Sequence, residues 1–169
     1  GEIRRVDITE RRWKRLMGTL SVRTVDGGTG GPTGSRVQLT ASDGKFYAPT
    51  DAYARLSGQG DHLFHTTGRF SVELPVGDTE LTVVKGFEFF PETTSTRITA
   101  GETTEIVVEL QRMTDMAAEG WYSASTHVHS NYGGNLHNTL ENLLMMSDAE
   151  DQDLVLEQVA NKDNRILDY

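Results

Sequence analysis

Two histidines separated by one residue, His127 and His129, are the part of this sequence best suited to chemistry. They end a run of residues 120–129 that is typical of a β-strand, and alternate residues of a strand point to the same face. Two imidazoles on one face can hold a single divalent cation through their ring nitrogens. The pair alone is a weak signal, because ordinary strands also carry surface or hydrogen-bonding histidines. Its place at the end of a strand, before a glycine turn and a helix, favours a metal site.

The residues after the pair predict the elements that must position it. Residues 130–134 form a polar glycine turn that leaves the end of the strand open to solvent and substrate. A helix should follow, with Asn138 as its N-cap and Glu141 as the reciprocal capping carboxylate. Residues 153–156 then predict a short, buried type of strand. The order strand, helix, strand is typical of the beginning of a parallel α/β barrel, whose catalytic groups lie at strand ends.

Three nearby side chains are weaker candidates. His137 would add a third imidazole, but it lies just before the helix cap and is more typical of a loop residue. Asp163 stands beside Lys162 in a polar loop, where an aspartate is more often a solvated turn residue. Tyr132 would either orient substrate or cover the mouth of the barrel, and both alternatives stay open.

Two further histidines, His62 and His65, stand three residues apart. That spacing suits one metal ion only if the segment is helical. Gly58, Gly60 and Gly68 flank the pair and disfavour a helix, so we expect ordinary surface histidines.

The region before residue 114 predicts an all-β domain. Short runs of alternating polar and apolar residues are bounded by turns of Gly, Pro and Asp, which is typical of a sandwich. An Asp43-Gly44 turn predicts a hairpin between residues 36–40 and Phe46-Tyr47, and residues 48–68 predict a long loop. Strands are expected at residues 19–23, 36–40, 69–75, 80–84, 95–99 and 104–110. The expected organisation is a lead-in segment at 1–15, a mainly antiparallel β-sandwich at 16–113, and the first strand-helix-strand of a second domain at 114–169.

Composition and charge narrow the classes of partner. The formal net charge of −9 disfavours nucleic acid and anionic lipid, which attract proteins through Lys and Arg. One short basic run, residues 11–15 around Trp13, is outweighed by the acidic total. The absence of cysteine excludes disulfides and thiolate ligands, so a metal must be held by His, Asp or Glu. No apolar run predicts a membrane span or a signal peptide, and the compartment stays undecided.

Two motifs stand out in the first domain. A glycine-led strand runs to a proline turn at residues 68–77, and Ala100-Gly101-Glu102-Thr103-Thr104 comes before the last strand. These motifs resemble the carboxypeptidase-regulatory, transthyretin-like family of sandwiches. This resemblance implies an immunoglobulin-like or transthyretin-like fold. It does not imply a reaction, because such modules commonly flank catalytic domains.

The second domain resembles another family. Its motifs are Gly120-Trp121-Tyr122, Thr126-His127-Val128-His129, Asn131-Tyr132-Gly133-Gly134, Asn138-Thr139-Leu140-Glu141 and Ala149-Glu150-Asp151. Together they are similar to the polymerase-and-histidinol-phosphatase family of metal-dependent phosphoesterases. Within it they resemble the branch related to carbaryl- and microcystin-degrading hydrolases.

This second resemblance implies a distorted barrel with two or three divalent ions, zinc, manganese or iron, that activate water against a phosphoester, carbamate or amide of a small-molecule substrate. It implies that His127 and His129 are the first metal ligands. Many relatives have Thr-Asp-His at the end of the second strand, whereas this sequence has Val159-Ala160-Asn161-Lys162-Asp163. A barrel of this type needs about 250 residues and roughly 50 are present, so we expect weak metal binding and no hydrolysis from this chain alone.

Other classes of function stay open at the level of sequence. The sandwich is alternatively a non-catalytic module that binds carbohydrate or protein, or a spacer or oligomerisation unit. We also expect the exposed edges of the first strands of the second domain to favour a homodimer.

Overall fold

The computed structural model describes residues 14–56, 59–129 and 138–158. Eight strands come first, and a short 3-10 helix, η1 (Ala117–Glu119), leads to β9 (Ala124–Val128), α1 (Leu140–Ala149) and β10 (Leu154–Glu157). No helix in the described ranges is long and apolar enough to cross a bilayer. The eight strands are β1 (Met17–Asp26), β2 (Ser35–Thr40), β3 (Ala54–Leu56), β4 (His62–Thr66), β5 (Arg69–Pro75), β6 (Gly77–Val84), β7 (Glu92–Ile98) and β8 (Thr103–Leu110).

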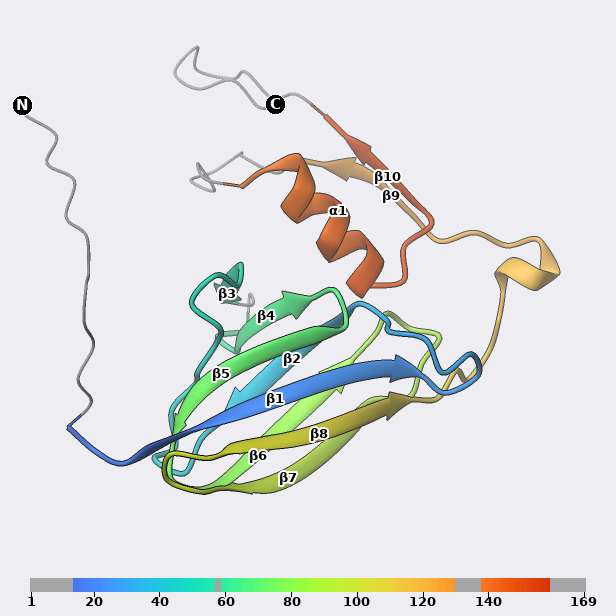
Figure 1. Cartoon of the computed structure of the whole chain (residues 1–169). Coiled ribbons are helices and arrows are strands. Elements are labelled where there is room, and N and C mark those ends of the chain that lie inside the picture. The colour runs from blue at the N-terminus through green and yellow to red at the C-terminus, as the bar shows by residue number, and fades with distance from the viewer. Residues whose placement is uncertain (1–13, 57–58, 130–137, 159–169) are drawn as a thin grey trace, which may run out of the picture.

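The first eight strands form two sheets, here together called the sandwich (Figure 1). One sheet has the order β5-β1-β8 and the other has the order β3-β4-β2-β6-β7. Most neighbours are antiparallel, but β1 and β8 are parallel, with Val22 opposite Ile106. The chain is therefore mainly β with a sandwich-like arrangement, as the alternating pattern predicts, and the expected antiparallel character has one exception. β1 and β8 lie far apart in sequence, and the local pattern of a strand does not encode the direction of a distant partner.

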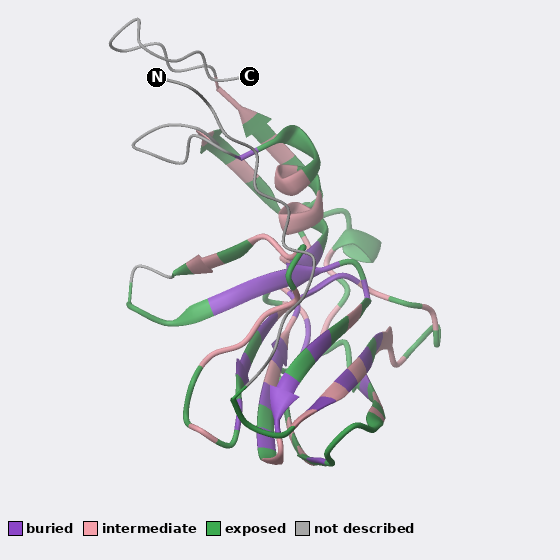
Figure 2. Cartoon of the chain, turned by 60° about the vertical axis from the view of Figure 1, so that its left-hand side comes forward, coloured by how far each residue is buried: buried purple, intermediate pink, exposed green. Residues whose placement is uncertain are grey.

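One apolar core lies between the two sheets. Alternate residues of β1, such as Leu20 and Val22, point inward and are buried, while their neighbours are partly exposed. Phe64 of β4 fills the centre and meets Phe70 of β5 edge to face at 5.0 Å. Every buried member of this core lies between Leu20 and Leu110. Figure 2 shows this concentration of buried residues in the sandwich.

The sequence-based prediction of a long loop at residues 48–68 is wrong, because β3 and β4 lie there. From Leu63 to Thr66, all residues of β4 are buried. The pattern of β4 therefore does not alternate, since α1 packs against this strand on the side away from the core. Phe46 makes only an isolated bridge with Thr40 in place of the expected second hairpin strand.

The strand-helix-strand order predicted after residue 120 is confirmed within the described residues. β9 and β10 are parallel neighbours, with Ala124 opposite Leu154. The helix cap differs from the prediction: Thr139, not Asn138, is the N-cap, and its hydroxyl accepts a hydrogen bond from the backbone N–H of Asn142. In Figure 1, α1 lies between the β9–β10 pair and the end of the sandwich.

The segment at the end of α1 joins the two parts of the chain. We call residues 148–151 the acidic turn, and the sandwich side chains around it the basic socket (Arg36, His65, Lys85 and Arg112). The carboxylate of Glu150 accepts from Arg36 at 2.8 and 3.1 Å and from Nε2 of His65 at 3.1 Å. Because a carboxylate only accepts, Nε2 of His65 carries the hydrogen in this contact.

Asp151 and the backbone complete the contact. The Nζ of Lys85 donates to the carbonyl of Asp148 and lies 3.7 Å from the carboxylate of Asp151, while Arg112 binds that carboxylate at 3.2 Å. A Cβ at Gly86, where φ is +47°, would stand 2.6 Å from both the Glu150 carbonyl and the Asp151 Cβ. Glycine at this position therefore permits the approach of the turn.

The sandwich should fold without the rest of the chain. Its core is drawn from residues 20–110, whereas among the described residues from 121 onward only Asn138 and Ala149 are buried. We expect residues 16–113 to give a β-rich circular dichroism spectrum and a cooperative thermal transition, and residues 114–169 alone to give neither. A non-cooperative melt of the 16–113 segment would contradict this.

The contact between the acidic turn and the basic socket should weaken in acid. Burial raises the pKa of Glu150, but the hydrogen bond from His65 and the charge of Arg36 outweigh burial, so that its pKa lies below the ordinary glutamate value. A depressed folded-state pKa contributes stability above the ordinary value, and this contribution is lost as pH falls through the folded-state pKa.

We therefore expect Glu150→Gln to lower the free energy of opening of α1 and β10 at neutral pH by about 1 to 2 kcal/mol. Hydrogen-exchange protection factors measure this free energy. The gap from the wild type should close as pH falls through the lowered folded-state pKa of Glu150, because the protonated carboxyl no longer carries the charge. Glu105→Gln, at an exposed position on β8, is the matched control. A gap that is constant with pH would show that the charge of Glu150 does not hold the turn.

Candidate metal-binding pair

The two histidines predicted from sequence lie together at the end of β9. Their rings are 4.8 Å apart at an interplanar angle of 80°, and their Nε2 atoms are separated by 3.0 Å. His127 is exposed and His129 is half-buried. The expectation that both imidazoles share one side of the strand is therefore confirmed, and the pair is accessible from solvent through His127.

One contact fixes which nitrogen of the neutral His129 ring carries the hydrogen. Its Nδ1 lies 2.6 Å from the backbone carbonyl oxygen of Gln158, just after β10. A carbonyl only accepts, so Nδ1 carries the hydrogen, and in the neutral ring Nε2 presents a lone pair toward His127. In the absence of a cation, the complementary arrangement is a hydrogen bond from Nε2–H of His127 to Nε2 of His129. The same lone pair is available to a metal ion.

The strand that carries the pair is fixed at both ends by the segment around β10. At its beginning, the backbone N–H of Ser123 donates to the carboxylate of Asp153 at 2.8 Å. Near its end, the side-chain amide of Gln158 donates to the carbonyl of Thr126 at 3.2 Å. β9 has β10 as its strand neighbour among the described residues, so these contacts supplement a short parallel ladder.

Tyr132, His137 and Asp163 lie outside the described residues. No group of three or more His, Asp or Glu side chains able to hold a metal is present in the described part of the chain.

His65 is not the surface residue that the sequence predicts. It is 5% exposed and holds Glu150 from β4. The basic socket was missed altogether, because its members are spread over residues 36–112. The adjacent apolar residues Leu63 and Phe64 were the local signal for a buried strand, and the neighbouring glycines concealed it.

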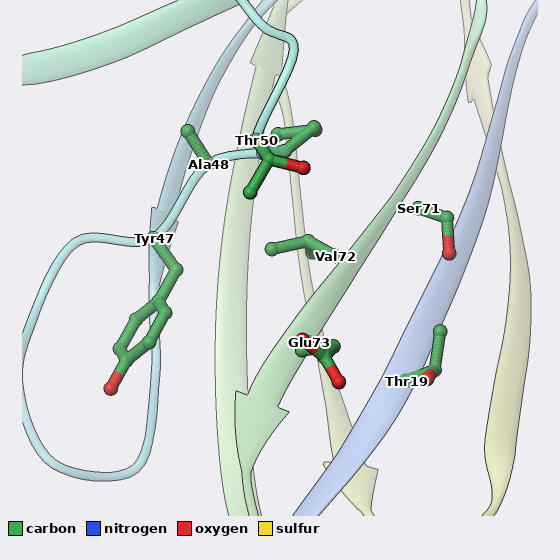
Figure 3. Close-up of a pocket in the computed structure, with 8 residues that line it drawn as sticks. Thr19, Tyr47, Ala48, Thr50, Ser71, Val72 and Glu73 are labelled. Carbon is green, nitrogen blue, oxygen red and sulfur yellow. The ribbon is translucent and has the colours of Figure 1, made fainter. Parts of the chain in front are cut away.

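The sandwich has a separate hollow away from the histidine pair. A cavity of about 350 Å³ is lined by residues of β1, β5 and the loop after Phe46. Figure 3 shows Tyr47, Ala48 and Thr50 on one side of it and Ser71 and Thr19 on the other. Its lining is mostly small and polar, with no metal-binding arrangement.

Comparisons with known proteins find partial matches among solved structures, all with low identity. No family model and no curated protein matches the chain. Among solved structures, the minor pilin GBS52 of Streptococcus agalactiae has 18% identity and a TM-score of 0.46, over 60% of this chain and 47% of the pilin. The TIE protein of Bacillus anthracis has 16% identity and a TM-score of 0.42, over 70% of this chain and 20% of that one. Phospholipase PlaB from Legionella pneumophila has 13% identity and a TM-score of 0.35, over 65% and 28%. The match therefore spans about half of the pilin and less of the other two.

Proposed function

We propose that this chain supplies the first two metal ligands of a metal-dependent hydrolase. The observation that carries the proposal is the convergence of Nε2 of His127 and Nε2 of His129 at 3.0 Å, with the ring of His129 held from behind by the carbonyl of Gln158. The hydrolase class comes from the sequence resemblance to the polymerase-and-histidinol-phosphatase family.

The two histidines fit a shared divalent ion. Imidazole nitrogens bind zinc at about 2.0 to 2.1 Å, which puts two nitrogens of one ion roughly 3.0 to 3.4 Å apart. Histidine ligands also donate their other ring N–H to a carbonyl or carboxylate, which fixes the tautomer and the ring orientation. His129 makes that contact with Gln158. Imidazole suits zinc and iron, and manganese is the more oxygen-preferring alternative.

The residues of the chain would bind and orient the ion. A bound divalent ion supplies Lewis-acid chemistry, which makes water a nucleophile near neutral pH. His127 and His129 would hold it at an exposed strand end, where a phosphoester, carbamate or amide can approach. Two imidazoles supply two ligands, so further carboxylates or histidines must come from outside the described part of the chain.

The arrangement around the pair supports the start of a barrel. β9, α1 and β10 have the parallel strand-helix-strand order of such folds. Leu154 and Leu156 of β10 are 50% and 46% exposed. Parallel sheets in proteins are normally covered on both faces, so these side chains favour further structure packed on this pair of strands.

A binding role for the sandwich is the second candidate function. The 350 Å³ cavity beside β5 favours it, because hydroxyl groups of Thr19, Thr50 and Ser71 line a hollow suited to a polar ligand such as a carbohydrate. The two functions are separable, since the cavity shares no residue with the histidine pair.

The first proposal predicts weak, histidine-dependent metal binding. Cobalt(II), zinc or manganese titrated into the chain should bind with modest affinity, and His127→Ala or His129→Ala should weaken binding at least about tenfold because each removes half of the protein ligands. Calorimetry measures all three ions, and cobalt absorption reports nitrogen ligation.

His62→Ala is the matched control, because His62 is exposed and stacks on Phe46 away from β9. If both single variants and the double variant bind metal as tightly as the wild type, the pair is an ordinary hydrogen bond and the metal-site proposal is wrong. The cavity would then be the stronger candidate.

A further inference from the structure

We propose that Asp151 is a positioning residue, through which the sandwich sets the geometry of the histidine pair. The inference rests on the proposed metal site and adds a role for the sandwich in it. Asp151 lies in the acidic turn, between the basic socket and the segment that fixes β9. Its side chain and its backbone contact different parts of the molecule.

The backbone of Asp151 adopts an unusual conformation. Its φ of +53° is the only positive value at a non-glycine position among the described residues. Aspartate tolerates this left-handed region better than most residues, but the conformation persists only where the surroundings fix it. The turn around it is closed by the backbone N–H of Asp151, which donates to the carbonyl of Asp148 at 3.1 Å.

The side chain of Asp151 belongs to the sandwich contact. Its two oxygens accept from Arg112 at 3.2 and 3.4 Å, and one of them lies 3.7 Å from Nζ of Lys85. Lys85 is 6% exposed and Asp151 is 19% exposed. Arg112 is itself fixed by Glu88 at 2.8 Å and by the ring of Phe89, 4.2 Å from its guanidinium carbon. A partly buried pair of this kind is screened less by solvent than an exposed one.

The backbone of Asp151 contacts the beginning of β9. Its carbonyl accepts a hydrogen bond from the hydroxyl of Ser123 at 2.9 Å. The hydroxyl of Ser123 in turn accepts from the N–H of Asp153 at 3.0 Å, and the carbonyl of Ser123 accepts from Leu154 at 3.1 Å. The start of β9 is therefore held by the same short segment that the sandwich holds through Asp151.

The path continues along the two strands to the histidines. β9 and β10 pair through Ala124 with Leu154 and Ser125 with Val155. Beyond β10, the carbonyl of Gln158 holds the ring of His129. A shift of β10 against β9 therefore moves the Gln158 carbonyl relative to Nδ1 of His129. The sandwich limits that shift because it fixes the residue just before β10.

The test replaces the side chain of Asp151 while keeping its backbone conformation. Asp151→Gly tolerates a φ of +53° and removes the side chain that Arg112 and Lys85 contact. We expect it to weaken metal binding about tenfold, the lower end of the effect of losing outer contacts of metal ligands. Glu105→Gln is the control, because Glu105 is exposed on β8 and belongs neither to the acidic turn nor to the basic socket. It should bind like the wild type.

A second readout distinguishes positioning from general stability. Nitrogen-15 chemical shifts of the metal-free chain report the tautomer of His129, and we expect Asp151→Gly to turn one tautomer into a mixture while the sandwich keeps its dichroism. Ser123→Ala removes the hydroxyl that joins Asp151 to β9, outside the core of the sandwich, and should act in the same direction.

The outcomes separate the two proposals. If the wild type shows no histidine-dependent metal binding, the proposed function fails, and the His129 tautomer still tests Asp151. If the wild type binds metal and both Asp151→Gly and Ser123→Ala keep its affinity and its tautomer, the positioning role is overturned while the metal site stands. If Asp151→Gly does not fold, Ser123→Ala decides.

Discussion

The position of β9, α1 and β10 on the sandwich depends on the contact between the acidic turn and the basic socket. The β9–β10 pair and α1 have almost no core of their own, so their place is set by Glu150 and Asp151 against four sandwich side chains. Burying these charges costs solvation free energy, which is recovered only when each carboxylate has well-placed donors. Arg36 and His65 supply them for Glu150, and Arg112 for Asp151. The contact is therefore specific in position, because a shifted turn would leave a charge without its donors.

The same specificity explains why a small parallel pair can present two imidazoles in a defined arrangement. A two-stranded ribbon is marginal in water. Here β9 is held at its start by Ser123 and near its end by Gln158, and both contacts come from the segment that begins at the acidic turn. The arrangement of the two histidine rings therefore depends on the sandwich, whereas the core of the sandwich does not depend on the histidines.

The sequence could predict what depends on local periodicity. Alternation located β1, β2, β5, β6, β7 and β8 to within a few residues, and the spacing of His127 and His129 placed their rings together. It could not predict β4, because Leu63 and His65 are buried by α1 from more than 70 residues away. The true cap, Thr139, stood beside an equally suitable Asn138, and only the observed backbone conformation distinguishes them. The direction of β8 against β1 was likewise a property of the assembled sheet.

The tautomer of His129 links the architecture to the chemistry. A histidine whose Nδ1–H is committed to a carbonyl has one remaining function, to present the lone pair of Nε2. The Nε2 of His127 stands 3.0 Å away and satisfies that lone pair as a donor when no cation is bound. A cation would replace the hydrogen between the two Nε2 atoms, and the proton of His127 would move to its Nδ1 or to solvent. The two rings would turn toward the ion, but the strands already bring them together before binding. Preorganisation of this kind reduces the entropic cost of binding. It requires that β10 hold the Gln158 carbonyl in register with β9, which is why a charged contact on the sandwich bears on a pair of histidines at the opposite end of the strand.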